Sequence, residues 1–136
     1  MENPFTDRIT YVSFTGIELT EATPDRAAGR LVVTENHHQP YGVVHGGVYC
    51  TLAETIASTG AAVWAMAQGL AGAVGLSNTT DFIRATTSGA LEAVATPIHR
   101  GRTQQLWEVH ITRDEDGKMV AHSQVRLQNI SDLESF

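Results

Sequence analysis

One long run of the chain, residues 48–66, constrains the fold more than any other segment, because apolar and small residues fill it at helical spacing. The run holds one carboxylate, Glu54, and no lysine or arginine. We predict a single long helix that begins at His45 and ends near Gly69, where glycine can adopt the left-handed conformation of a helix cap. An uncompensated carboxylate in such a helix costs on the order of several kcal/mol, so Glu54 has either a structural partner or a chemical task.

Short segments with the pattern of strands surround this helix. Residues 11–19 and 27–34 carry β-branched and aromatic residues on either side of a turn-rich stretch, which predicts a first antiparallel pair. Four further strands are predicted after the helix, at residues 72–83, 90–98, 104–113 and 118–130. The last two are joined by Asp116-Gly117, a strong hairpin signal. These elements predict an α+β domain in which an antiparallel sheet of about six strands wraps around the helix.

The whole chain has the length of one compact domain. We expect a single domain over residues 1–136, with loose termini at 1–9 and 131–136. A formal net charge of -6 argues against a nucleic-acid partner, because such domains usually carry a basic surplus. The N-terminus lacks a signal-peptide pattern and the single cysteine, Cys50, cannot form an internal disulfide, so we expect a cytoplasmic protein. Polar residues interrupt the helical run, so no membrane span is expected.

The start of the predicted helix has the character of an anion site. Gly46 and Gly47 leave backbone N–H groups that no side chain shields, and the helix dipole adds partial positive charge. Glu54 lies about two turns further along, roughly 12 Å away at 1.5 Å per residue. One chain therefore cannot easily bring Gly46 and Glu54 to the same carbonyl. If both groups serve one reaction, Glu54 comes from a second subunit, which predicts a homodimer at least.

Glu54 is expected to share its helix face with small or hydroxylic neighbours: Cys50, Thr51, Ser58 and Ala61. The side expected to pack on the sheet carries Leu52, Ile56, Val63 and Met66. The helix pattern leaves two interpretations of Glu54 open. It is either a core acid hydrogen-bonded to Thr51 or Ser58, or a functional carboxylate with room for substrate and water beside it.

Several segments carry recognisable motifs: residues 39–48 (QPYGVVHGGV), 52–55 (LAET), 97–102 (PIHRGR), 107–109 (WEV) and 116–121 (DGKMVA). Together and in this order they resemble the signature of the hotdog-fold acyl-CoA thioesterases. The most similar groups are the phenylacetate-pathway thioesterases and the Arthrobacter-type 4-hydroxybenzoyl-CoA thioesterases. The resemblance covers most of residues 31–127 and favours the functional interpretation of Glu54.

The resemblance implies hydrolysis of an acyl- or aryl-CoA to the free acid and coenzyme A, without a metal or any cofactor beyond the coenzyme A of the substrate. By the same resemblance, Glu54 is the catalytic carboxylate, either as nucleophile or as general base. The backbone N–H of Gly46 polarises the thioester oxygen, and the amide of Gln39 lies near the thioester. His45 orients the loop or the carbonyl, and Ser58 holds the hydrolytic water. Two such sites per dimer, and a dimer of dimers, are expected.

Further residues are expected to contact the substrate. Gly47 lies at the helix start, and the strand with Asp81 and Phe82 helps to line the acyl pocket. That strand lacks the histidine of some relatives, which leaves the acyl group open. A basic set is expected to meet the phosphates of coenzyme A, since guanidinium groups suit phosphate: Arg84, His99, Arg100, Gly101 and Arg102. The alternative for these residues is a solvated strand end.

Three other functions are considered. His37, His38 and His45 are of a residue type that binds zinc, but their spacing fits no metal motif and we expect no metal. A hotdog dehydratase or hydratase uses a histidine with an acid, at a different spacing from that of His45 and Glu54. A non-catalytic acyl-CoA sensor on the same fold is the alternative from a different class.

Overall fold

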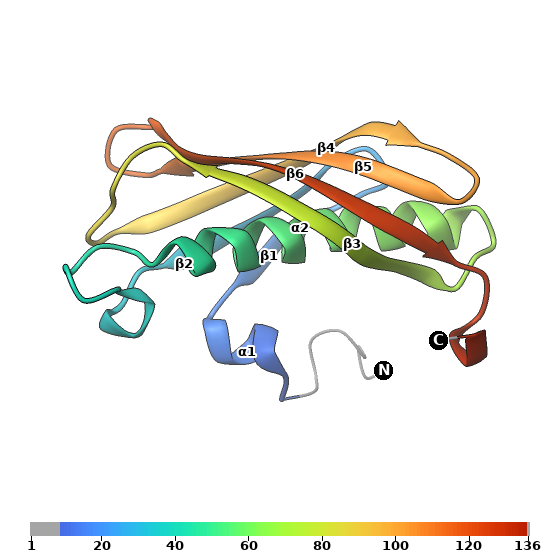
Figure 1. Cartoon of the computed structure of the whole chain (residues 1–136), viewed down its shortest axis with the longest axis horizontal. Coiled ribbons are helices and arrows are strands. Elements are labelled where there is room, and N and C mark those ends of the chain that lie inside the picture. Colours follow the sequence, from blue (N-terminus) through green and yellow to red (C-terminus); the bar gives the residue numbers. More distant parts are fainter. Residues whose placement is uncertain (1–8, 136) are drawn as a thin grey trace.

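The computed structural model describes residues 9–135, in which six strands form one antiparallel sheet around a long helix (Figure 1). The strand order is β1-β2-β4-β5-β6-β3. The strands are β1 (Glu18–Ala22), β2 (Ala27–Val32), β3 (Gly72–Phe82), β4 (Ala90–Arg100), β5 (Gln104–Arg113) and β6 (Met119–Ile130). The helices are α1 (Tyr11–Thr15) and α2 (Gly46–Ala67), with short 3-10 turns η1 (Glu35–His37) and η2 (Leu133–Ser135). This is the α+β arrangement expected from the sequence.

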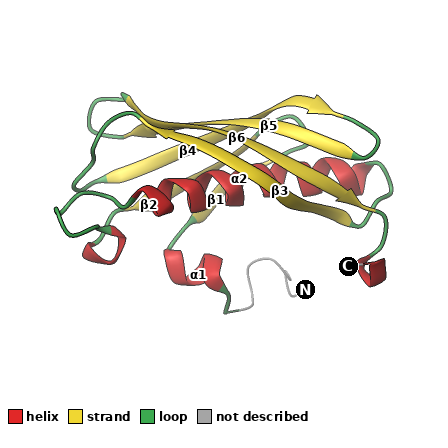
Figure 2. Ribbon diagram, in the orientation of Figure 1, coloured by secondary structure: helices red, strands yellow, loops and turns green. Residues whose placement is uncertain are grey.

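Helix α2 lies along one face of the sheet, which curves over it (Figure 2). Leu52 and Ile56 on α2 are fully buried in one cluster with Trp107 of β5, and this cluster is the core. The helix and sheet come very close at Gly60, where a Cβ atom would lie 2.7 Å from the Trp107 ring. Only a glycine permits this approach, because real Cβ contacts are not that short.

A buried amide fastens α2 to the sheet. The Gln105 side chain, which has no exposed surface, donates from Nε2 to the carbonyl oxygen of Ala61 (3.1 Å) and to Oδ1 of Asn129 (2.7 Å). Its Oε1 accepts a hydrogen bond from Nε1 of Trp107 at 2.8 Å. Each polar end of this buried side chain is therefore satisfied, as stable burial requires. The helix is held in one position relative to β5 and β6.

The prediction of a strand over residues 11–19 is wrong. Residues Tyr11–Thr15 form the short helix α1, and β1 begins only at Glu18. Ser13 caps the start of α1, accepting at Oγ a hydrogen bond from the Thr10 N–H (2.8 Å), and Gly16 ends it with φ 83°. The aromatic and β-branched residues of this segment misled the prediction, while its local caps decided the structure.

Other boundaries agree closely with the predictions. Helix α2 ends at Ala67, with Gly69 in the left-handed conformation (φ 84°), and β3 to β6 match the four predicted strands within two residues at each end. Residues 133–135 of the expected loose tail form η2, with the Glu134 N–H donated to Asp132 Oδ1, and the looseness of this tail stays a prediction. Residues 1–8 and 136 lie outside the described residues, as does that part of the prediction about the termini.

The expected faces of α2 are wrong in part. Ala61, placed with Glu54 by the prediction, is fully buried. Val63 and Met66, expected against the sheet, instead line an open groove, and Met66 is 43% exposed. Within residues 9–135, no helix is long and apolar enough to cross a membrane.

Candidate active site

Glu54 lies midway along α2, on the side of the helix that the sheet leaves open, and its side chain is exposed. A groove of about 470 Å³, here called the Glu54 groove, is lined by Tyr11, Val12, Cys50, Thr51, Glu54, Thr55 and Asn78. The Thr51 hydroxyl forms a 2.9 Å hydrogen bond with the Tyr11 hydroxyl rather than with Glu54. The core-acid interpretation of Glu54 is therefore wrong.

A second groove of about 500 Å³ also reaches Glu54 and is here called the apolar groove. It contains Ser58, the predicted water-binding residue, one turn beyond Glu54. Most of its other lining residues are apolar: Val12, Leu19, Ala22, Ala62, Val63, Met66 and Ala73. The Glu54 carboxylate thus stands where the Glu54 groove and the apolar groove meet. The arrangement can place an acyl group beside a charged carboxylate.

Strand β3 fixes the surroundings of Glu54. At Gly75 a Cβ atom would lie 3.3 Å from the Glu54 carboxyl carbon and 3.4 and 3.5 Å from its two oxygens. The pairing of β3 with β6 shifts between Gly75 and Ser77. Asn78, next along, donates from Nδ2 to the carbonyl oxygen of Cys50 at 2.9 Å, one turn before Glu54 on α2. The Glu54 carboxylate therefore lies against the backbone of Gly75.

The start of α2 is capped by His45. Its Nδ1 accepts a hydrogen bond from the Gly47 N–H at 2.8 Å, and its own N–H is donated to the His37 carbonyl. The Gly47 N–H, predicted to face substrate, is therefore occupied. Among the hydrogen bonds formed by residues 9–135, none uses the Gly46 N–H, so this donor is available. His45 leaves one helix-end donor for a ligand while satisfying the next.

Gly46 opens into a pocket of about 290 Å³, the Gly46 pocket, which also contains Gln39, Tyr49, Phe82 and Arg84. Gln39 accepts the Tyr41 N–H at Oε1, which leaves its Nε2 amide as a donor. Arg84 donates from Nη1 to the Met119 carbonyl at 2.8 Å and brings a positive charge to the rim. The Phe82 ring covers Gly46 so closely that a Cβ there would lie 2.7 Å from the ring. Two N–H donors and a cation therefore line one pocket, a combination that can stabilise an oxyanion.

Burial also affects the tyrosine beneath this pocket. Tyr49 is 2% exposed, and burial raises the pKa of its hydroxyl. The ring of Tyr49 packs against Phe82, with centroids 6.0 Å apart. Tyr49 is therefore a neutral part of the pocket floor at ordinary pH, since an unperturbed tyrosine already has a pKa near 10.

Gly46 and Glu54 occupy separate cavities of the chain. They lie on the same helix, roughly 12 Å apart at 1.5 Å per residue. Among the described residues, none lines both the Gly46 pocket and the Glu54 groove. One chain therefore presents the helix-start donors and the Glu54 carboxylate at two separate places.

The predicted basic set is divided. Arg84 lies at the Gly46 pocket, but Arg100 lies beside Trp64, which is roughly 27 Å along α2 from Gly46 at 1.5 Å per residue. The Arg100 guanidinium stacks 5.7 Å from the Trp64 ring centroid and donates to the Pro24 carbonyl (2.6 Å) and to Asp25 Oδ1 (2.9 Å). These contacts indicate a structural role for Arg100, which joins α2 to residues 24–25.

The rest of the predicted coenzyme A segment lies at the same end of the sheet as Arg100. His99 and Arg102 are exposed there. The Gly101 N–H is donated to the Gln104 carbonyl, and the Gly101 carbonyl accepts from Asn129 Nδ2 at 3.0 Å. Gly101 thus closes the turn between β4 and β5 and offers no backbone group to a ligand. Arg102 and His99 remain the side chains of this segment that solvent can reach.

Asp81 does not line these cavities. It pairs directly with His122 on β6, whereas its neighbours Thr80 and Phe82 pair with the buried Ser123 and Ala121. Since side chains alternate along a strand, Asp81 projects from the outer face of the sheet, away from α2. Its predicted contact with the acyl group does not fit this chain's own pockets.

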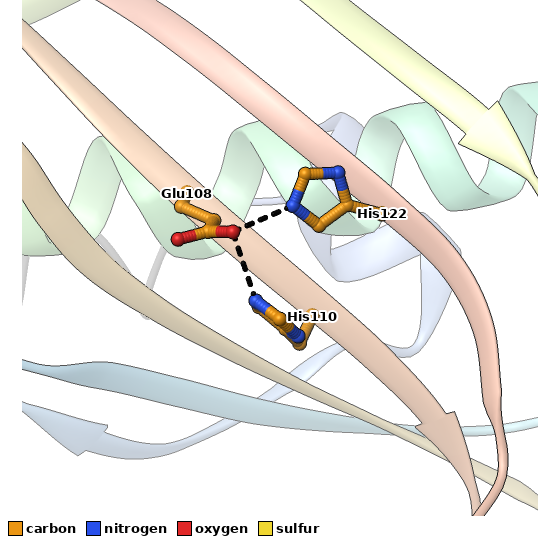
Figure 3. Close-up of side chains that lie close together, drawn as sticks. All are labelled: Glu108, His110 and His122. Atoms are coloured by element: carbon orange, nitrogen blue, oxygen red, sulfur yellow. Dashed lines mark hydrogen bonds and ion pairs between the residues drawn. The ribbon is translucent and has the colours of Figure 1, made fainter.

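The three histidines weighed as metal ligands have separate tasks. His37 accepts the Thr34 N–H at Nδ1 (2.9 Å), and its Nε2 lies 2.8 Å from the Thr15 carbonyl. The Nε2 of His38 lies 2.7 Å from the Thr87 carbonyl. Sequence reasoning overlooked a different group, Glu108, His110 and His122 on the outer face of the sheet (Figure 3). It also missed Tyr11, Gly75 and Asn78 beside Glu54, which are distant from it in sequence.

Residues 41–120 match the thioesterase superfamily. The chain belongs to this superfamily. That range contains both Gly46 and Glu54, and the sheet wrapped around α2 is the hotdog fold expected from the sequence. Membership makes the chain a thioester hydrolase.

Relatives of this thioesterase support the assignment. The Mycobacterium tuberculosis protein Rv1847 is 47% identical over 128 residues, which cover 93% of this chain and 91% of that one, and its solved structure superposes with a TM-score of 0.86. A 1,4-dihydroxy-2-naphthoyl-CoA hydrolase of Listeria monocytogenes is 38% identical, over 79% of this chain and 85% of its own. The solved thioesterase HI1161 of Haemophilus influenzae is 34% identical, over 92% of this chain and 85% of its own, with a TM-score of 0.83.

Proposed function

We propose that this thioesterase hydrolyses an acyl-CoA at a site completed by two subunits of a homodimer. One subunit supplies Glu54, and the other supplies the Gly46 N–H and the Gln39 Nε2. The observation that carries the proposal is the division of these groups between two cavities of one chain: available donors in the Gly46 pocket and an exposed carboxylate in the Glu54 groove. An exposed carboxylate becomes a useful catalyst when a second surface excludes water from it.

The proposed reaction needs no metal and no cofactor beyond the coenzyme A of the substrate. The Gly46 N–H and the Gln39 amide hydrogen-bond to the thioester oxygen as it becomes negative. As nucleophile, the Glu54 carboxylate attacks the carbonyl carbon, the coenzyme A thiolate departs, and water at Ser58 cleaves the resulting anhydride. As general base, Glu54 takes a proton from that water while the water oxygen attacks, and the proton then passes to the thiolate.

Features of strand β3 support dimer formation. It is an edge strand, paired only with β6 among the described strands, and so leaves backbone groups for another chain. Leu76 and Phe82 on this strand are 51% and 58% exposed. The same strand borders both Glu54 and Gly46. A second copy at this edge would therefore bring its own groups close to both cavities, and a dimer of dimers is the assembly that we propose.

We infer an aromatic acyl group as the preferred substrate. The apolar groove beside Glu54 has a volume of about 500 Å³ and a largely aliphatic lining. The Listeria relative is named as a hydrolase of a naphthoyl-CoA. Within the superfamily, the motifs of residues 39–48 and 52–55 favour a place among the phenylacetate-pathway and Arthrobacter-type thioesterases. Arg84, at the rim of the Gly46 pocket, is our first candidate for a phosphate of coenzyme A.

A panel of aryl- and alkyl-CoA substrates tests this proposal, with release of the free thiol as the readout and Glu54→Gln as the control. We expect turnover of aromatic thioesters by wild type and a rate at least roughly 100-fold lower for the variant. Tight binding of acyl-CoA without thiol release by the folded wild type would instead indicate the sensor function. Release that continued unchanged in Glu54→Gln would refute the catalytic assignment.

A further inference from the structure

Three side chains converge on the outer face of the sheet, opposite α2 (Figure 3). His110 on β5 and His122 on β6 are direct partners across the two strands. Glu108 is two residues before His110 and so projects from the same face. One oxygen of Glu108, Oε1, lies 2.7 Å from Nε2 of His122 and 3.1 Å from Nε2 of His110.

The geometry of this cluster suits a metal ion. The three potential ligand atoms all lie within 4.8 Å of one another. Zinc binds imidazole nitrogen and carboxylate oxygen at about 2.0–2.2 Å, which puts adjacent tetrahedral ligands roughly 3.3–3.6 Å apart. The observed 2.7 and 3.1 Å separations are within a small side-chain rotation of that spacing. The two imidazole rings are nearly perpendicular, at 86°, with both Nε2 atoms directed at the same oxygen (Figure 3).

Solvent access and the local negative charge also favour the binding of a cation to this cluster. The side chains of His110, Glu108 and His122 are 51%, 34% and 27% exposed, so an ion can reach them from solvent. Asp81 stands directly beside His122 in the sheet, on the same face, and adds a second negative charge. Two imidazoles and one carboxylate form a donor set typical of zinc, cobalt and nickel sites, with coordination positions left for water.

We propose that Glu108, His110 and His122 form a binding site for a divalent transition metal ion, of which zinc is the type case. The ion links β5 to β6 outside the hydrolytic site, because these side chains face away from the helix that carries Glu54. Binding replaces the hydrogen bonds between the histidines and Glu108 with bonds to the metal, and each neutral imidazole then binds through Nε2 and carries its one proton on Nδ1.

The expected affinity follows from the surroundings of the histidines. No hydrogen bond to Nδ1 of His110 or His122 is formed within the described part of the chain. Metal sites that lack such outer partners bind roughly 10- to 100-fold more weakly than supported ones. We therefore expect reversible binding and a stabilised protein, rather than a fold that depends on the ion.

Calorimetric titration of chelator-treated, untagged protein with zinc chloride tests the site, with the visible absorption of bound Co²⁺ as an independent readout of coordination. We expect one ion per chain and a higher melting temperature with zinc. Glu108→Gln, His110→Ala and His122→Ala should each weaken binding by roughly tenfold or more. His99→Ala, which removes an exposed histidine outside the cluster, should bind zinc like wild type.

One control checks that the variants fold, and three outcomes would contradict the proposal. His110 is the most exposed member of the cluster, so His110→Ala should retain the wild-type melting temperature without metal. The proposal is overturned if wild type binds no zinc at millimolar concentration, or if both histidine variants bind it undiminished. Loss of acyl-CoA hydrolysis on adding a chelator would overturn the separation of this site from the hydrolytic one. The metal titrations do not depend on the proposed hydrolysis, so either proposal can fail alone.

Discussion

The carboxylate of Glu54 lies against Gly75 with no side chain between them. A Cβ atom at position 75 would lie 3.3 Å from the carboxyl carbon, tighter than most real Cβ contacts, so Glu54 would have to move. Because a displacement of about 1 Å can cost roughly 100-fold in rate, Gly75→Val should lower kcat on the order of 100-fold and Gly75→Ala less. Gly72→Ala on the same strand meets nothing within 4 Å and is the matched control. Equal rates for Gly75→Val and Gly72→Ala would contradict this role for β3.

Glu54→Gln should lower kcat by roughly 100- to 10,000-fold, because the amide can neither accept a proton nor attack a carbonyl. Glu54 is exposed, so its replacement should change the free energy of unfolding by no more than about 0.5 kcal/mol. Steady-state kinetics and chemical denaturation of the same preparation measure both effects. A large loss of stability would argue that Glu54 has a structural partner after all.

Mixing two inactive variants tests the shared site. In a mixture of Glu54→Ala and Gln39→Ala chains, half of the dimers are mixed and each mixed dimer has one intact site. We therefore expect about a quarter of wild-type activity after subunit exchange, as an isologous dimer requires. The exchange itself is followed by fluorescence transfer between labelled chains. Exchange without any recovered activity would show that both groups act within one chain.

Arg100 and Arg102 should differ although they are close in sequence. Arg100→Ala removes a cation–π contact worth about 1 kcal/mol together with its hydrogen bonds, so it should lower the melting temperature. Arg102 is exposed, and Arg102→Ala should raise KM for acyl-CoA without lowering stability. That increase should shrink at high ionic strength and disappear with a truncated thioester that lacks the nucleotide. The same KM for full-length acyl-CoA in wild type and Arg102→Ala would end the coenzyme A assignment for Arg102.

Asp116 makes the stability of the hairpin between β5 and β6 depend on pH. Arg113 donates to its carboxylate from Nε (2.9 Å) and Nη2 (2.8 Å), and these hydrogen bonds, with that of the Lys118 N–H, lower the pKa of Asp116 below its ordinary 3.8. A lowered folded-state pKa contributes stability above the unfolded value, and this contribution is lost as the pH falls through the folded one.

Asp116→Asn should therefore melt below wild type by a constant interval from pH 7 to about pH 5, and the interval should close as the pH falls toward 2. Thermal melts of both proteins across this range provide the measurement. An interval that widened on acidification would contradict the assigned direction.

The sequence was sufficient for much of the fold because the strands after α2 alternate apolar and polar residues regularly. Glycines also mark both ends of α2: Gly46 and Gly47 begin the helix, and Gly69 follows its end in the left-handed conformation. Residues 11–15 were misassigned because their aromatic and β-branched content outweighed the capping signals of Ser13 and Gly16. The helix pattern left open whether Glu54 is a core acid or a functional carboxylate, because its neighbours are apolar or small, and its exposure excludes the core acid. Small residues do not by themselves show which face of a helix is covered.

The cluster of Glu108, His110 and His122 shows what sequence patterns leave out. Glu108 and His110 share a strand, but His122 joins them only through the register of β5 and β6. The Asp116-Gly117 signal predicts a two-residue turn, and pairing outward from such a turn places His110 opposite Ser123. A register shift between Ile111 and Thr112, which the sequence pattern does not show, brings His110 opposite His122 instead. The contact of Gly75 with Glu54 is also hidden from the sequence, because it joins a helix to a strand through tertiary packing.

The separation of Gly46 from Glu54 along one stiff helix has a consequence for a newly made chain. Such a chain holds every chemical group that the proposed reaction needs, but it holds them too far apart to act on one thioester. Under the proposed dimer, hydrolysis begins only when two copies meet, and its onset depends on the square of the chain concentration. Acyl-CoA would then escape hydrolysis for as long as the concentration of the enzyme is low.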